Sequence, residues 1–112
     1  MTDCQIYIES VIFYYTANQH CVNLKVSTRY DGHQIRWKFG ECSSRGKYAD
    51  DMTYIHRCCL EPGDHTLTCI NTKEPHGWKQ GFIEIEGNRY CHDFMGYKAM
   101  RRIAITSIKY YT

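Results

Sequence analysis

The chain lacks several features that would place it in a common functional class. No apolar run approaches the roughly 20 residues that a membrane-spanning helix needs. Charge of one sign is also scarce, since 14 Lys and Arg residues offset 12 Asp and Glu residues to give a formal net charge of +2. A dedicated nucleic-acid-binding domain usually carries a clustered basic stripe. We therefore expect neither membrane insertion nor nucleic-acid binding.

The motifs of common enzymes are missing as well. The sequence contains no Gly-x-Ser-x-Gly, no His-Glu-x-x-His, no phosphate-cradling glycine loop and no dinucleotide fingerprint. Its paired acidic residues, Asp50 with Asp51 and Glu84 with Glu86, fit a turn and the solvent face of a strand. We expect a protein without catalytic activity or a cofactor, and a small hydrolase is the weakest alternative.

No secretion signal is visible at the start of the chain, and no Asn-x-Ser/Thr sequon occurs in it. Cysteine, by contrast, is abundant, with 7 residues in 112. Such density usually indicates disulfides formed in an oxidising compartment. We expect a secreted, extracellular protein with one thiol left over from pairing. The alternative is a reduced cytosolic protein with buried thiols.

Hydrophobic and polar residues alternate in segments separated by turn signals. Alternation occurs at residues 22–27, 34–39, 66–69, 83–86 and 103–105, and it resumes at 108–110 after a possible bulge. A period of two predicts strands with one buried face. Residues 5–15 predict a further strand, apolar on both faces in its second half. Residues 41–57 predict a surface loop leading to a short strand around Tyr54, and residues 98–102 a solvated loop and strand start.

The fold that these segments predict is all-β. Turn signals lie at residues 30–33, 61–64, 74–77 and 86–88, and no amphipathic helix separates the strands. A chain of 112 residues has no room for a second hydrophobic core. We expect one domain over residues 1–112, an antiparallel, jelly-roll-like β-sandwich stapled by disulfides.

Two polar loops, around residues 30–34 and 70–81, carry the candidate binding chemistry. A sugar offers an apolar face to an aromatic ring and hydroxyls to carboxylates, amides and imidazoles, and ligand sites commonly combine such groups. Trp78 either lines this site or packs beneath the loop, whereas Trp37 alternates with polar residues as a core residue does. The candidate ligand-binding residues are Trp78, His76, Glu74, Gln80, Lys79, Asp31 and His33, with Gln34 beside them.

We expect the cysteines to form disulfides and not a metal site. No zinc-like pair of Cys-x2–4-Cys motifs is present, and the neighbours Cys58 and Cys59 point to opposite faces of a strand. A bond between Cys4 and Cys21 is plausible if the first two strands pair. The pool available for pairing is Cys4, Cys21, Cys42, Cys58, Cys59, Cys69 and Cys91.

Residues 58–69, CCLEPGDHTLTC, and residues 77–91, GWKQGFIEIEGNRYC, carry a resemblance. Together they resemble a cysteine-containing extracellular β-sandwich module of marine invertebrates, and the resemblance covers residues 35–94. The chain is also similar in size and cysteine use to small lectins of sponges and echinoderms. The resemblance implies a secreted recognition domain. The module's acidic loop, DSYGDGW, is replaced here by residues 71–78, which are one residue longer and lack two acidic positions, so no calcium site is implied.

We therefore expect a non-catalytic lectin that binds glycans, such as those containing N-acetylhexosamine or galactose, through loops at one end of the sandwich. A homo-oligomer is expected, because multivalency strengthens weak single-site binding, and the exposed pairs Tyr14–Tyr15 and Tyr110–Tyr111 are candidates for its interface. The alternative is an extracellular protein-interaction, structural or venom module that binds no sugar.

Overall fold

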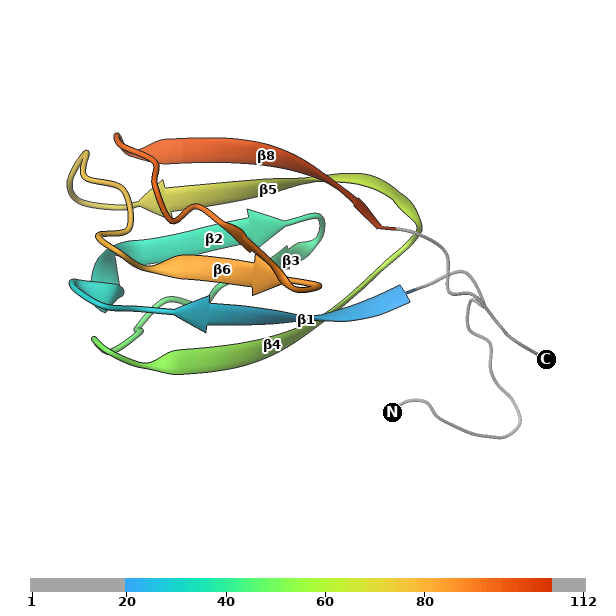
Figure 1. Cartoon of the computed structure of the whole chain (residues 1–112), viewed down its shortest axis with the longest axis horizontal. Coiled ribbons are helices and arrows are strands. Elements are labelled where there is room, and N and C mark those ends of the chain that lie inside the picture. The colour runs from blue at the N-terminus through green and yellow to red at the C-terminus, as the bar shows by residue number, and fades with distance from the viewer. Residues whose placement is uncertain (1–19, 106–112) are drawn as a thin grey trace.

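The computed structural model of the chain describes residues 20–105, which form an all-β sandwich (Figure 1). Its strands are β1 (His20–Ser27), β2 (Ile35–Phe39), β3 (Cys42–Ser43), β4 (Thr53–Leu60), β5 (Gly63–Asn71), β6 (Phe82–Ile85), β7 (Asn88–Tyr90) and β8 (Lys98–Ile105). Sheet A has the order β4-β1-β6-β7 and sheet B the order β3-β2-β5-β8. All pairings between these strands are antiparallel. The predicted antiparallel β-sandwich is confirmed.

The alternating residues fill the space between the two sheets. Leu24 and Val26 of β1 are fully buried, as are Ile83 and Ile85 of β6 beside them. Sheet B contributes its own inward-facing residues, among them Trp37, which is 3% exposed. Trp37 is thus a core residue, as its position in the alternation predicts. Burial of such side chains stabilises the fold by about 1.5–3 kcal/mol each.

Six cysteines of residues 20–105 form three disulfides. Cys42–Cys58 joins β3 to β4, Cys69–Cys91 joins β5 to the end of β7, and Cys21–Cys59 joins β1 to its neighbour β4. The first two bonds connect sheet A with sheet B, and Cys58 and Cys59 face opposite sides of β4, as predicted. These bonds indicate an oxidising environment. The suggested Cys4–Cys21 bond is wrong, because the pairing of β1 with β4 places Cys21 opposite Cys59; Cys4 lies outside the described residues.

Two segments differ from the sequence prediction. Residues 53–60 form an eight-residue strand, β4, where only a short strand around Tyr54 was expected. Its outward face carries Ile55, which is 60% exposed and obscures the alternation. Residues 98–102, expected as a loop and strand start, belong entirely to β8, which pairs with β5 along its length. The predicted strand at 5–15, the continuation at 108–110 and the tyrosine pairs lie outside the described residues.

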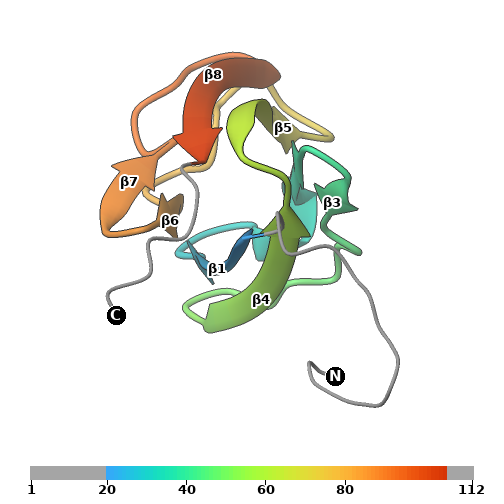
Figure 2. The same ribbon diagram turned by 90° about the vertical axis from the view of Figure 1, so that its right-hand side faces the viewer.

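Four connections meet at one end of the sandwich, which we call the loop end (left in Figure 1). They are residues 28–34, 44–52, 72–81 and 91–97. The turns at 40–41, 61–62 and 86–87 lie at the other end. Viewed along the strands, β3 and β4 lie on one side and β7 and β8 on the other (Figure 2). Within residues 20–105, no helix has the length and hydrophobicity needed to span a membrane.

A hydrogen-bonded chain of three side chains fixes the 44–52 connection to the core. The Tyr48 hydroxyl accepts a hydrogen bond of 2.9 Å from Trp37 Nε1 and lies 2.8 Å from His56 Nε2. Burial raises the pKa of Tyr48 and lowers the pKa of His56, so both stay neutral near pH 7. The polar atoms of this partly buried chain satisfy one another, which holds the connection in place.

Candidate functional site

The loop end brings together the two polar loops singled out in the sequence. The Lys79 ammonium donates to Oδ2 of Asp31 in the β1–β2 connection and to Oε1 of Glu74, 3.0 Å away, in the β5–β6 connection. All three side chains are partly exposed. Hydrogen bonding from Lys79 lowers the pKa of both carboxyl groups, and the carboxylates in turn raise the pKa of Lys79. We call these three residues the bridged triad.

The backbone beneath the bridged triad adopts conformations that L-residues rarely take. Asp31, Lys79 and Gln80 have φ values of 54°, 47° and 72°. The left-handed region costs a non-glycine residue roughly 1–2 kcal/mol, although Asp tolerates it better than most. Lys47, Asp51, Glu86 and Cys91 adopt the same conformation in other turns, so it is a general feature of the tight turns in residues 20–105.

Asn71 organises the loop that carries Glu74. Its side chain is buried, and its Oδ1 accepts hydrogen bonds from the backbone N–H groups of Lys73 at 2.9 Å and Glu74 at 2.8 Å. Its Nδ2 donates to the Gly77 carbonyl at 2.8 Å. Gly77 is required here, because a Cβ atom would lie 1.9 Å from the Phe94 carbonyl oxygen. One amide side chain therefore holds both ends of the turn.

Trp78 supports the loop from below and offers no ring face to a ligand. Only 2% of it is exposed, and its Nε1 donates to the Ile70 carbonyl at 3.0 Å. Its ring packs edge-on against the Phe94 ring, with 6.2 Å between the ring centres. Of the two alternatives left open for Trp78, packing beneath the loop is the one observed, so its ring cannot stack on a ligand. The glycines on either side let the chain turn inward, so the apolar ring is buried beneath the loop.

The other predicted site residues lie at the loop end with different relations to the bridged triad. His33 and His76 are exposed, and their proximity to Asp31 and Glu74 contributes to the lowered pKa of those carboxyl groups. Gln80, next to Lys79 in the chain, is exposed, and within residues 20–105 its side chain makes no hydrogen bond to the triad. Gln34 is buried, and its Oε1 has no hydrogen-bond partner within residues 20–105.

Exposed tyrosine and methionine side chains at the loop end were missed in the sequence. Tyr30 is 48% exposed and Met52 48%, while Met95 and Tyr97 in the β7–β8 connection are 75% and 55% exposed. Tyr30 immediately precedes Asp31, and the Arg29 guanidinium lies 5.4 Å from its ring centre. In the sequence, the only signal that marks Tyr30 as a loop residue is the Asp31-Gly32 turn that follows it.

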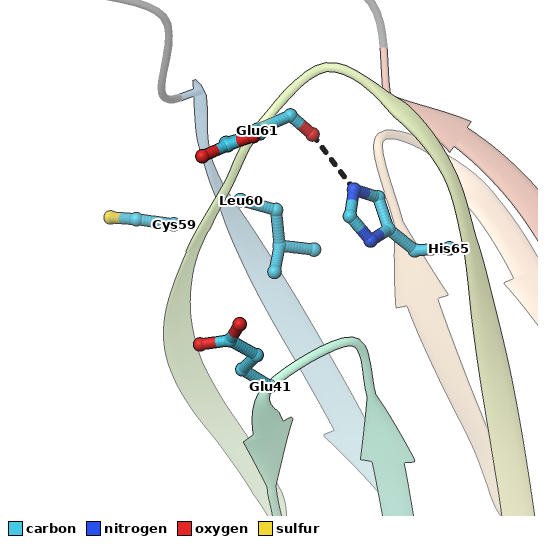
Figure 3. A pocket seen from close by; sticks show the side chains of 5 residues that line it. All are labelled: Glu41, Cys59, Leu60, Glu61 and His65. Carbon is cyan, nitrogen blue, oxygen red and sulfur yellow. Dashed lines mark hydrogen bonds between the residues drawn. The ribbon is translucent and has the colours of Figure 1, made fainter. Parts of the chain in front are cut away.

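A cavity of about 310 Å³ lies away from the loop end, where the β2–β3 and β4–β5 turns approach each other (Figure 3). Glu41, Glu61 and His65 give it a polar lining, and Cys59 and Leu60 complete it. His65 Nε2 donates to the Glu61 carbonyl at 2.7 Å, which orients the imidazole. The volume is at the lower limit of small-ligand sites.

A second hollow, of about 410 Å³, lies on the outer face of sheet A between β1, β4 and β6. Lys25 and Ile55 line it together with Glu84 and Glu86. Glu84 thus faces outward from sheet A, as its alternation predicts, whereas Glu86 lies in the β6–β7 turn and not on the strand where it was expected. Neither cavity includes a residue of the bridged triad.

Residues 20–105 contain no group of three His, Cys, Asp or Glu side chains placed to hold a metal ion. In the bridged triad, the position between two carboxylates is taken by the Lys79 ammonium. The cation that pairs with these two carboxylates is therefore part of the chain.

Comparison with known proteins returns no match for this chain, whether among family models, characterised proteins or solved structures. A function for the protein therefore has to be inferred from its fold and from the geometry of the loop end.

Proposed function

We propose that the protein is a secreted, non-catalytic carbohydrate-binding module whose loop end recognises glycans. The observation that supports this most is the bridged triad, because Lys79 joins the two polar loops into one surface next to the exposed Tyr30. A tyrosine ring can cover the apolar face of a pyranose, as Trp78 cannot. Carboxylates and an ammonium group can bond the hydroxyls around it.

The bridged triad retains hydrogen-bonding capacity after its internal bonds are made. Lys79 uses one oxygen of each carboxylate, and an ammonium group has three N–H donors, of which two are engaged. Two groups are left for a ligand: Asp31 Oδ1 as an acceptor and, beside it, the third Lys79 N–H as a donor. The pairing also holds the side chains in place before binding, which reduces the entropy lost on association.

A glycan array tests the proposal. The full chain, with its disulfides intact, is expected to bind a subset of neutral glycans, and Tyr30→Ala and Asp31→Asn are each expected to weaken that binding about tenfold or more. Glu41→Gln, at the opposite end of the sandwich, is the matched control and should leave binding unchanged. Absence of any signal at high protein concentration, or equal losses in the control, would refute the proposal.

The second candidate is a protein-interaction module, which the exposed Met52 and Met95 favour. Tyrosine, methionine and arginine are enriched where proteins bind proteins, and these two methionines lie at the same end as Tyr30 and Tyr97. Competition with free monosaccharides separates the candidates. Binding to a glycoprotein that free sugar abolishes supports the lectin, and binding that free sugar leaves intact supports the protein-interaction module.

A further inference from the structure

The outward face of sheet B is basic, which the total charge of the chain conceals. The register of β2, β5 and β8 places outward side chains in three cross-strand rows: Arg36–Ile70–Lys98, Lys38–Thr68–Met100 and Thr66–Arg102. The intervening residues of β2, such as Trp37, point into the core. We call these eight outward residues the basic face.

Acidic residues are nearly absent from this face in the described part of sheet B. Asp64, in the next outward row after the third, lies 3.7 Å from Arg102, and both side chains are more than half exposed. An exposed pair of this kind is weak. In the first two rows, Arg36 and Lys98 lie opposite Ile70, and Lys38 lies opposite Thr68 and Ser43, so none of these cations has a carboxylate directly opposite.

The outward face of sheet A shows that this is not a general property of the sandwich. There Lys25 stands between Ile55 and Glu84, and Glu84 in turn lies opposite Arg89, 3.9 Å away. Charges of opposite sign alternate along this row, so Lys25 and Arg89 both lie opposite Glu84, whereas Arg57, in the next outward row, lies opposite Asn23. The two faces therefore have different electrostatic character although they are built from the same kinds of strand.

Residues 44–47 extend the basic face beyond β2. The Ser44 N–H donates to the Trp37 carbonyl at 3.0 Å, so the chain continues alongside β2 after β3 ends. Gly46 lies against the Arg36 guanidinium, since a Cβ atom on it would be 2.5 Å from Cζ of Arg36. Arg45 and Lys47, on either side of Gly46, are both exposed and add two positive charges at this edge.

We propose that the basic face binds a linear anionic polysaccharide, sulfated or carboxylated. Neighbouring strands are about 4.8 Å apart and alternate residues along a strand about 7 Å apart, so the cations form a flat grid with spacings of about 7–10 Å. A polymer with a charge on each sugar repeat meets several of them at once. The Thr66 and Thr68 hydroxyls between the cations can bond sugar hydroxyls. A single-stranded nucleic acid would favour aromatic rings among the cations, and the three rows contain none; double-stranded DNA is a competitor in the test below.

Dextran sulfate and unsulfated dextran, which differ only in charge, test this proposal with the full chain at several salt concentrations. We expect binding to dextran sulfate alone. Lys38→Gln/Lys98→Gln is expected to weaken it about tenfold or more near 0.15 M salt and to reduce the slope of log K against log salt by about two. The matched control, Lys25→Gln/Arg57→Gln, removes the same charge from sheet A and should change binding less than about threefold.

Three results would overturn the proposal: no binding to dextran sulfate, equal losses in the two double variants, or equally tight binding to double-stranded DNA. Because all four substituted side chains are exposed, unchanged melting temperatures should confirm that each variant is folded. The basic face and the bridged triad share no residue. Failure of one proposal is therefore distinguishable from failure of the other.

Discussion

The Cys69–Cys91 disulfide should stabilise both the fold and the loop end. It joins buried residues of the two sheets, 22 positions apart in the chain. Closing a loop of that length removes unfolded-state entropy worth roughly 3.4 kcal/mol at 25 °C. In Cys69→Ala/Cys91→Ala we expect that loss in urea unfolding, together with a decrease of about 15 °C in melting temperature.

Loss of the Cys69–Cys91 disulfide should also loosen the loop end, which loss of a disulfide that only stabilises the fold would not. Cys91 begins the connection whose Gly96 carbonyl accepts the Gly77 N–H at 3.0 Å, so its loss should loosen the loop end. Cys21→Ala/Cys59→Ala is the control, since it opens a longer loop of 38 positions but joins neighbouring strands of one sheet. We expect faster hydrogen exchange at Gly77 in the first variant only. A loss below about 1 kcal/mol in that variant, or retained protection of Gly77, would refute the reasoning.

Three further predictions concern the loop end. Trp78→Ala should lower the free energy of unfolding in urea by about 3–5 kcal/mol. Trp78→Phe should lower it by about 1–2 kcal/mol, because the hydrogen bond to the Ile70 carbonyl is lost. A Trp78→Ala protein as stable as the wild type would contradict the burial of Trp78. The lowered pKa values of Asp31 and Glu74 contribute stability that is present above their ordinary values of 3.8 and 4.5 and is lost as the pH falls through the folded values. The melting temperatures of wild type and Lys79→Met should therefore differ at neutral pH and converge only as the pH falls below 3.8; a constant difference would argue against the bridge. Excess EDTA should shift the melting temperature by less than about 1 °C, because Lys79 supplies the cation; a large decrease would reveal a metal.

Much of the fold can be predicted from the sequence because the strands bury one face each. Leu24, Val26, Ile83 and Ile85 alternate strictly with polar residues, and all four are in the core. β4 was underestimated because Ile55 faces solvent, where the pattern calls for a polar residue. The pairing of Cys21 with Cys59 depends on which strands are neighbours, and local sequence does not contain that information.

The candidate site was predictable in its residues but not in its contacts. Asp31, Glu74 and Lys79 stand out as polar loop residues, yet their meeting depends on two connections about 40 residues apart sharing one end of the sandwich. Trp78 was ambiguous because a tryptophan between glycines fits both a buried anchor and an exposed ring. Tyr30 was missed because exposure of a single aromatic residue in a loop has no periodicity that would reveal it.

The central claim, that the loop end binds neutral glycans through the bridged triad, is tested most directly by an NMR titration of the ¹⁵N-labelled full chain with neutral oligosaccharides. We expect amide shift changes concentrated in residues 30–34 and 73–80, and their absence in Asp31→Asn. Changes confined to the cavity around Glu41 and His65, or no changes at millimolar sugar, would contradict it.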